Sequence, residues 1–216
     1  MKIFTVKEIP TLHWSSPTPY NLKPKLLTFF YLNFGLVLFG LGEALLITSS
    51  AGVSPWTVLA QGIAGKTGWS IGFVTMVVSF AVLTLWIPLK QKPGMGTILN
   101  ALIIAFMIDF SLVYLPHPET LVWQILQAAL GVLVIGIASG MYLTSNLGPG
   151  PRDGLMKGLQ SITGYPIAYI RIAIEVTVVA IGWYLGGVVG IGTVLFAFGV
   201  GPAVALGILF VKRFLA

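Results

Sequence analysis

Long apolar runs alternate with short polar or glycine- and proline-rich segments along most of this chain. Six such runs lie at about 28–49, 71–88, 97–115, 121–146, 167–185 and 193–211. Each run falls within or close to the roughly 17–25 residues that an α-helix needs to cross a bilayer. The pattern therefore predicts an all-α membrane protein with six transmembrane helices.

Two further segments, PWTVLAQGIAGKTG at 55–68 and PRDGLMKGLQSITG at 151–164, are too short and too polar to count as spans. Each begins at the proline of a Gly-x-x-Pro sequence, in which glycine permits the turn that ends one helix and proline suits the start of the next. They are predicted to form short half-helices over 55–66 and 151–162. These half-helices are either re-entrant or flat in the interface, and the recurrence of the break in both halves favours the re-entrant form.

The two halves of the chain resemble each other. An ungapped alignment at an offset of 96 residues pairs 35–110 with 131–206, and 18 of the 76 positions are identical. Because each copy contains three spans, the second is expected to insert upside down relative to the first, as in many transporters. The predicted organisation is a polar cytoplasmic tail (1–27), a first repeat (28–115) and a second repeat (121–211).

Composition supports a lipid environment. Only 8% of the 216 residues are charged and the mean hydropathy is +0.96, whereas soluble domains carry about 25% charged residues. Eleven of the twelve lysines and arginines lie on one side of the predicted topology, with Lys66 on the other. The positive-inside rule then places both termini in the cytoplasm and accounts for the net charge of +6 without nucleic acid.

Catalytic chemistry is not expected. The chain has no cysteine and two histidines, and neither histidine is near a second ligand or a nucleophile in the sequence. We therefore predict no enzyme activity, no metal and no cofactor.

Four ionisable residues fall inside predicted spans, where charges are costly and are candidates for function: Glu43, Asp109, Arg171 and Glu175. Arg171 and Glu175 are four residues apart and are expected to pair on one helix face. Glu43 has no local partner and is free to contact Arg171 or a solute, whereas Asp109 approaches the outer end of its span. Thr97 and Thr193 are expected to be N-caps, and aromatic residues near span ends, Trp86 among them, to form interfacial belts.

The repeats differ at the break, where Trp56 and Thr57 of the first copy correspond to Arg152 and Asp153 of the second. Asp153 is favourable near a helix N-terminus. Arg152 is either an anion ligand or a headgroup anchor. If both half-helix N-termini point to one place, they form a solute site, whose candidate residues are Ser54, Pro55, Trp56, Thr57, Gly148, Gly150, Pro151, Arg152, Asp153 and Gly154.

Several stretches carry a resemblance to a known family, above all GPGPRDGLM and the pattern RxAIEVxxxxxGWxLGG that follows it. Over about residues 30–210 the chain is similar to the YczE-like membrane proteins of bacteria, within the YczE/YyaS/YitT grouping. The resemblance implies a multi-spanning protein of the bacterial inner membrane, without a settled substrate. In that family the first motif usually reads SPWDVL, and Thr57 here replaces the acid, which argues against an essential carboxylate at this position.

Two functional hypotheses follow. The first is a small transporter or channel-like permease for a small polar, anionic or zwitterionic solute, bound between the half-helix N-termini. The alternative is a membrane scaffold that docks a cytoplasmic partner through Arg152 and Lys157. The expected partners are the lipid bilayer and this solute, and a homodimer is left open.

Overall fold

The computed structural model describes residues 9–215, which form helices and no β-strand. The helices are α1 (Leu26–Thr48), α2 (Pro55–Thr67), α3 (Ile71–Leu85), α4 (Met95–Leu112), α5 (Leu121–Thr144), α6 (Pro151–Thr163), α7 (Ile167–Tyr184) and α8 (Ile191–Phe214). The prediction of an all-α membrane protein is therefore confirmed. The two short helices begin at the prolines of the Gly-x-x-Pro sequences.

Five helices, α1, α4, α5, α7 and α8, are long and apolar enough to span a bilayer alone. The sixth predicted span is shorter than expected, because α3 has 15 residues and joins α2 across a bend of 115°. Its end at Leu85 has a local cause. Pro88 follows three residues later, and the residue before a proline is disfavoured in the helical conformation.

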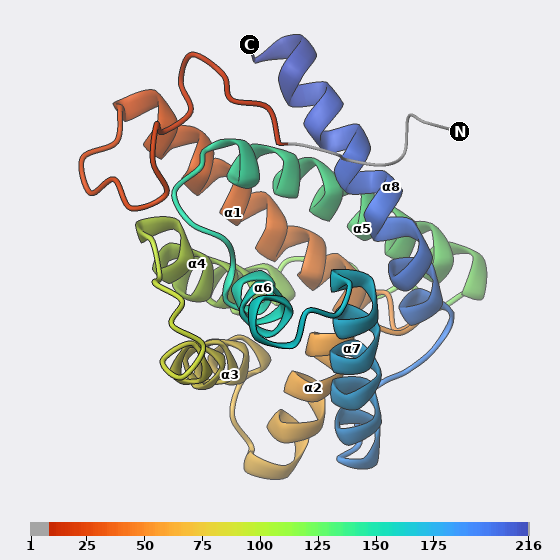
Figure 1. Ribbon diagram of the computed structural model, residues 1–216. Helices are drawn as coiled ribbons and strands as arrows, with labels where there is room; N and C mark the ends of the chain where they lie inside the picture. The colour runs from red at the N-terminus through yellow and green to blue at the C-terminus, as the bar shows by residue number, and fades with distance from the viewer. Residues whose placement is uncertain (1–8, 216) are drawn as a thin grey trace.

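At the centre of the molecule α1 packs against α5, with α4 on the far side of α1 and α8 against α5 (Figure 1). The short helix α2 packs against α7, and α6 packs against α3. Glycines allow the tight contact between α5 and α8: a Cβ atom on Gly136 would lie 2.4 Å from the backbone of Ala203. Large apolar side chains such as Phe106 and Phe198 remain exposed on the outside, as expected where lipid covers the surface.

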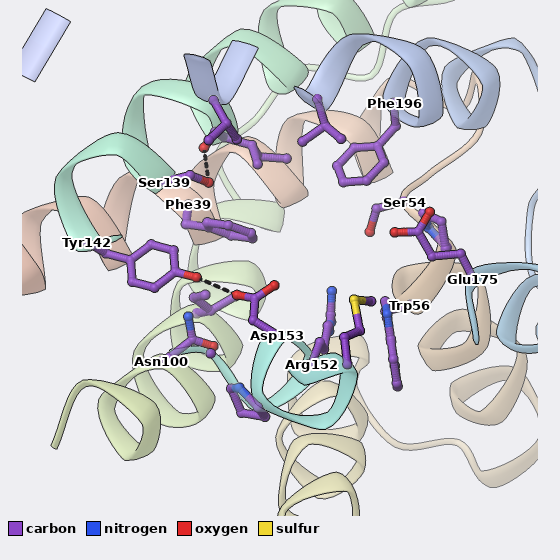
Figure 2. Close-up of a pocket in the computed structure, with 18 of the residues that line it drawn as sticks. Phe39, Ser54, Trp56, Asn100, Ser139, Tyr142, Arg152, Asp153, Glu175 and Phe196 are labelled. Carbon is purple, nitrogen blue, oxygen red and sulfur yellow. Dashed lines mark hydrogen bonds between the residues drawn. The ribbon is translucent and has the colours of Figure 1, made fainter. Parts of the chain in front are cut away.

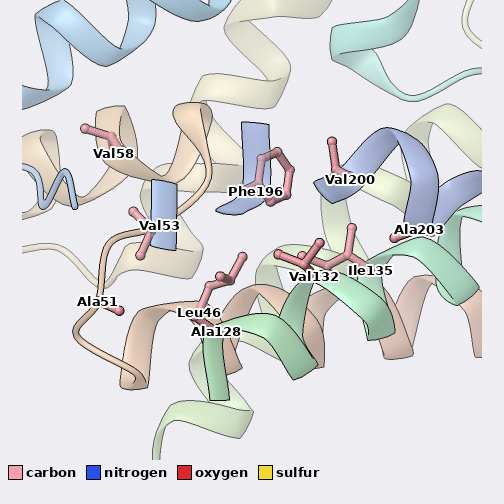
Figure 3. Close-up of a cluster of buried hydrophobic side chains, with 10 residues drawn as sticks. All are labelled: Leu46, Ala51, Val53, Val58, Ala128, Val132, Ile135, Phe196, Val200 and Ala203. Carbon is pink, nitrogen blue, oxygen red and sulfur yellow. The ribbon is translucent and has the colours of Figure 1, made fainter. Parts of the chain in front are cut away.

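One buried apolar cluster connects the first break to the central helices (Figure 3). The cluster includes Leu46 at the end of α1, Val53 in the break, and side chains of two further helices: Val132 and Ile135 of α5 and Phe196 of α8. All five side chains are at least nine-tenths buried. The cluster holds the start of α2 against the centre of the molecule.

The two halves contact each other reciprocally. The Gly96 N–H donates to the Leu147 carbonyl at 2.7 Å, and the Gly192 N–H donates to the Ala51 carbonyl, also at 2.7 Å. Gly192 is the counterpart of Gly96, and Leu147 is the counterpart of Ala51, so the same bond is formed once in each direction. Contacts exchanged in this way are those of two units related by a two-fold rotation.

Backbone conformation repeats at the same offset. In the described part of the chain the residues with positive φ form four pairs 96 residues apart: Ser50 and Asn146, Gly52 and Gly148, Gly68 and Gly164, and Lys90 and Gly186. Gly52 (φ 112°) and Gly148 (φ 110°) sit in the breaks, where an L-side chain would be strained. The repeat seen in the sequence therefore corresponds to matching turns.

Thr97 and Thr193 are not N-caps, as the sequence suggested. The helices begin two residues earlier, with Gly94 and Gly190 as the N-cap residues. The Thr97 hydroxyl accepts a hydrogen bond from the Gly94 N–H at 3.1 Å and donates to the Pro149 carbonyl at 2.7 Å. The threonine thus connects the start of α4 to the second break.

The segment before α1 is more than a polar tail. Its first eight residues lie outside the described part of the chain, but Trp14 is fully buried and its indole N–H donates to the Leu215 carbonyl at 2.6 Å. The Ser16 N–H donates to the Ser145 carbonyl at 3.0 Å, and the Asn146 amide donates to the Ser16 carbonyl at 2.8 Å. Residues 12–16 therefore hold the C-terminus and the second break together.

Candidate functional site

The two short helices begin in the same way. Ser54 and Gly150 are extended N-cap residues without a side-chain cap bond, and Pro55 and Pro151 occupy the first helical turn. Both helices end at a left-handed glycine, Gly68 or Gly164, the usual terminating conformation. The first-turn N–H groups of α2 and α6 therefore lack partners from their own helix.

Both helices begin at one cavity of about 430 Å³ (Figure 2). Ser54, Pro55 and Trp56 line it from α2, and Pro151, Arg152 and Asp153 line it from α6. An arrangement flat in opposite interfaces would separate these N-termini by most of the membrane thickness. Their meeting agrees with the re-entrant form.

The cavity lies where the two halves of the chain face each other. Its lining includes eight pairs of residues 96 positions apart: Phe39 and Ile135, Ser54 and Gly150, Pro55 and Pro151, Trp56 and Arg152, Thr75 and Arg171, Ser79 and Glu175, Asn100 and Phe196, and Ile104 and Val200. One pair is in direct contact, with the Arg152 guanidinium 5.1 Å from the centre of the Trp56 ring. Matching positions of the two halves therefore meet at this cavity.

The charges of this cavity are one-sided. All four acidic or basic residues that line it belong to the second half: Arg152, Asp153, Arg171 and Glu175. Their counterparts in the first half are uncharged: Trp56, Thr57, Thr75 and Ser79. Matching positions of the two halves thus differ in charge.

Arg152 lines this cavity. Its guanidinium covers the face of Trp56, a favourable cation–π geometry. Among residues 9–215 no carboxylate lies within 4 Å of it. The guanidinium therefore keeps donors that a bound group could use.

Asp153 is held on the opposite side of the cavity from Glu175 (Figure 2). Its carboxylate accepts a hydrogen bond from the Tyr142 hydroxyl at 2.7 Å. As an acidic residue in the first turn of α6, it is also favoured by the positive end of that helix, as predicted. A carboxylate can accept further hydrogen bonds, and Asp153 keeps that capacity toward the cavity.

The predicted pairing of Arg171 with Glu175 is confirmed, since Arg171 Nε lies 2.8 Å from Glu175 Oε1. Their side chains are 44% and 19% exposed. Both line the cavity, but they largely neutralise each other.

Glu43 lies behind the cavity wall and does not contact Arg171. It is 1% exposed, and its carboxylate accepts hydrogen bonds from the hydroxyls of Ser54 (2.9 Å) and Thr57 (2.8 Å). Thr57 therefore serves this buried network and does not line the cavity. The second half exchanges these residue types. Ser139 of α5 stands at the position equivalent to Glu43, and Asp153 of α6 stands at the position equivalent to Thr57, so the carboxylate is on the short helix.

Three other candidate residues have structural roles away from the cavity. A Cβ atom on Gly148 would lie 2.7 Å from Thr97 Oγ1, so this glycine permits close contact between the breaks and α4. One on Gly154 would lie 2.0 Å from the Trp86 ring. Asp109 accepts hydrogen bonds from the Ser70 hydroxyl and, at 2.7 Å, from the Gly72 N–H, so it stabilises the start of α3 and is not an isolated intramembrane charge.

Trp86 is not part of an interfacial belt. It is 2% exposed, and its indole N–H donates to the Pro151 carbonyl at 3.0 Å. Its ring separates α3 from α6 at Gly154. At the equivalent contact of the other half, Gly182 of α7 lies directly on the backbone of Val58.

Some lining residues were not expected from the sequence, notably Tyr142, Asn100 and Ser139. Ser139 could have been found by applying the 96-residue offset to Glu43. No local pattern distinguishes Tyr142 or Asn100 from other polar residues in a span. Within residues 9–215 no three histidine, cysteine or acidic side chains converge as metal ligands.

Comparisons with known proteins identify relatives of this chain. The chain is 39% identical over 199 residues to an uncharacterized protein of Haemophilus influenzae, covering 92% of this chain and 90% of that protein. It is 34% identical over 176 residues to the uncharacterized membrane protein YczE of Bacillus subtilis, covering 79% of each. The uncharacterized protein YyaS of Bacillus subtilis is 24% identical over 176 residues, covering 77% of this chain and 85% of that protein.

No solved structure matches the chain. Residues 26–208 match the model of a family of unknown function, DUF6198. The predicted resemblance to YczE-like proteins is confirmed, and the chain is a membrane protein that belongs to the DUF6198 family.

Proposed function

We propose that the protein is a small permease of the bacterial inner membrane that carries a small polar or anionic solute. The observation that carries this proposal is the shared cavity at the starts of α2 and α6. In many secondary transporters the solute binds at the interface between two internal repeats, in a site formed by the N-termini of discontinuous helices.

An inverted orientation of the two repeats completes the proposal. Three long segments per repeat reverse the direction of the second copy, and the reciprocal hydrogen bonds of Gly96 and Gly192 support a two-fold relation between the copies. With the lysines and arginines on the cytoplasmic side, both termini are cytoplasmic. On this proposal the two-fold axis lies in the membrane plane at the cavity, which is the arrangement of many inverted-repeat transporters.

The size and lining of the cavity support a small solute. Its volume of about 430 Å³ lies near the lower end of the roughly 300–1,000 Å³ of ligand pockets. Phe39, Trp56 and Phe196 provide apolar walls, and a few polar groups converge between them. The unpartnered N–H groups of the two helix starts add a partial positive charge.

Solute flux into proteoliposomes tests this function directly. The purified protein is reconstituted and offered radiolabelled amino acids, short-chain carboxylates, phosphate and sulfate. We expect at least one solute to enter faster than into empty liposomes, and Arg152→Ala to reduce that flux about tenfold or more, because a charged hydrogen-bond donor is lost.

Lys157→Ala is the matched control, because Lys157 is an exposed cation of the same helix and does not line the cavity. It should leave flux unchanged, and both variants are compared at equal reconstituted amounts. Absence of flux for every solute would contradict the permease and favour the scaffold. Equal loss in both variants would contradict the role of the cavity.

A further inference from the structure

The charges of the cavity specify more than a polar solute. Asp153 and Glu175 line it and Glu43 lies directly behind Ser54, so three carboxylates surround two guanidinium groups. Arg171 and Glu175 form a pair at 2.8 Å. With that pair set aside, the cation of Arg152 faces the anions of Asp153 and Glu43.

None of these three groups neutralises another by contact. The carboxylates whose charge acts on the Arg152 guanidinium are those of Glu43, Asp153 and Glu175, yet none in the described chain lies within 4 Å of it. Glu43 is fully engaged with two hydroxyls and is 1% exposed. Arg152 and Asp153 are therefore the two groups with hydrogen-bonding capacity left for a ligand.

A ligand with a single charge suits this arrangement poorly. A simple anion attracted by Arg152 is repelled by Asp153, with Glu43 and Glu175 close by. Although the carboxylates outnumber the guanidinium groups, a simple cation on Asp153 is repelled by Arg152 and leaves the donors of Arg152 without an acceptor. Because charges inside a protein interact more strongly than in water, the repulsion offsets much of the favourable electrostatic binding energy of each such ligand.

The two-fold architecture leads to the same conclusion. Matching positions of the two halves line the cavity, but the α6 side carries Arg152 and Asp153, whereas Trp56 lines the α2 side and no acidic residue of the described chain does so. A symmetric ligand would gain nothing from this difference. A ligand whose two ends differ in charge is held in one orientation by it.

We propose that the cavity binds a small zwitterion, with its anionic group on the Arg152 guanidinium and its cationic group on the Asp153 carboxylate. Amino-carboxylates are the solutes of this class that we expect, with their carbon chain against the aromatic walls of Phe39 and Phe196. This proposal rests on the proposed permease function, because it names the class of solute that this same cavity carries.

Calorimetric titration of the purified, detergent-solubilised protein tests the charge requirement. The zwitterions are alanine, β-alanine and 4-aminobutyrate, which separate their charges by increasing distances. Butyrate and butylammonium provide the same carbon chain with one charge each. We expect at least one zwitterion to bind about tenfold or more tightly than both single-charge compounds at neutral pH.

Substitutions at Asp153 and Arg152 test separately how the cationic and the anionic end of the ligand are bound. Asp153→Asn should weaken zwitterion binding about tenfold while leaving butyrate binding unchanged or tighter, because a repelling carboxylate is removed. Arg152→Gln should weaken the binding of both. Lys157→Ala should change neither, and the thermal unfolding midpoint of each variant shows whether it is folded. An unfolded protein binds none of the probes, so the opposite effects of Asp153→Asn on two ligands are not explained by loss of structure.

The outcomes distinguish this inference from the proposed function. If butyrate binds as tightly as every zwitterion, or if no zwitterion binds, the zwitterion site is overturned. If a zwitterion binds as expected but does not enter proteoliposomes, the site stands and the permease fails. If only an anion such as phosphate is transported, the permease stands and the zwitterion site fails.

Discussion

Glu43 connects α1 to the start of α2 behind the cavity wall, and its replacement tests how that wall is held. The carboxylate accepts hydrogen bonds from Ser54 at 2.9 Å and from Thr57 at 2.8 Å, and the two hydroxyls are 3.0 Å apart. All three residues are at most 1% exposed. Each polar group of this network therefore has its partner within the protein.

We expect Glu43→Ala to lower the free energy of unfolding by about 2–4 kcal/mol. The two hydroxyls keep their mutual bond, so one O–H donor is left buried without an acceptor, at about 1–3 kcal/mol. The side chain also loses one buried CH₂ group, at about 0.8 kcal/mol. Glu43→Gln keeps the volume, one carbonyl acceptor and an amide that can donate to the hydroxyl oxygens, so its loss should stay below about 1 kcal/mol.

Thermal unfolding in detergent measures the difference. For a chain of this size about 1 kcal/mol corresponds to roughly 2–4 °C, so Glu43→Ala should lower the midpoint by about 10 °C and Glu43→Gln by less than about 4 °C. Glu175→Ala is the control, because Glu175 is an ion-pair partner that is 19% exposed and such pairs contribute little. Equal midpoints for Glu43→Gln and Glu43→Ala would refute the role of volume and acceptors.

Three further predictions concern how the elements are held together. Gly52→Ala and Gly148→Ala should each cost about 1–3 kcal/mol of unfolding free energy, since both have φ near 110°; thermal midpoints that differ by more than about 5 °C would contradict equivalent turns. Trp14→Ala should cost about 3–5 kcal/mol in denaturant unfolding and Trp14→Phe much less, because the indole is fully buried; an unchanged Trp14→Ala would show that residues 12–16 do not hold the second break. Gly154→Ala should destabilise the protein because its Cβ would lie 2.0 Å from the Trp86 ring, and Trp86→Phe should restore part of the loss in a double-mutant cycle; additive effects would contradict direct contact.

Local patterns explain most of what could be predicted about the fold. The starts of α2 and α6 follow from Gly-x-x-Pro, whose effects on the backbone need only neighbouring residues. The Arg171–Glu175 pair follows from a spacing of four on one helix. The predicted span at 71–88 was too long, because the apolar run extends to residue 88 but the helix ends at Leu85, ahead of Pro88.

The candidate site could be predicted only in part. Comparing the chain with itself located both half-helix starts, and Arg152 and Asp153 line the cavity between them. Proximity in sequence also suggested Gly148 and Gly154, but these glycines provide space for Thr97 and Trp86. Whether a glycine faces a ligand or a neighbouring helix depends on packing, which the local sequence does not encode.

The sequence alone determined the all-α membrane architecture, the two breaks and the repeat, because hydropathy, helix termination and an offset of 96 residues are properties of the chain itself. Only the tertiary structure decided which distant groups meet: Tyr142 with Asp153, Glu43 with Ser54, and Trp14 with the C-terminus. These pairs lie on helices or segments whose relative positions result from the packing of the whole molecule. The physical reason is that a hydrogen bond requires atoms within about 3 Å, a condition set by the packing of helices far apart in the sequence.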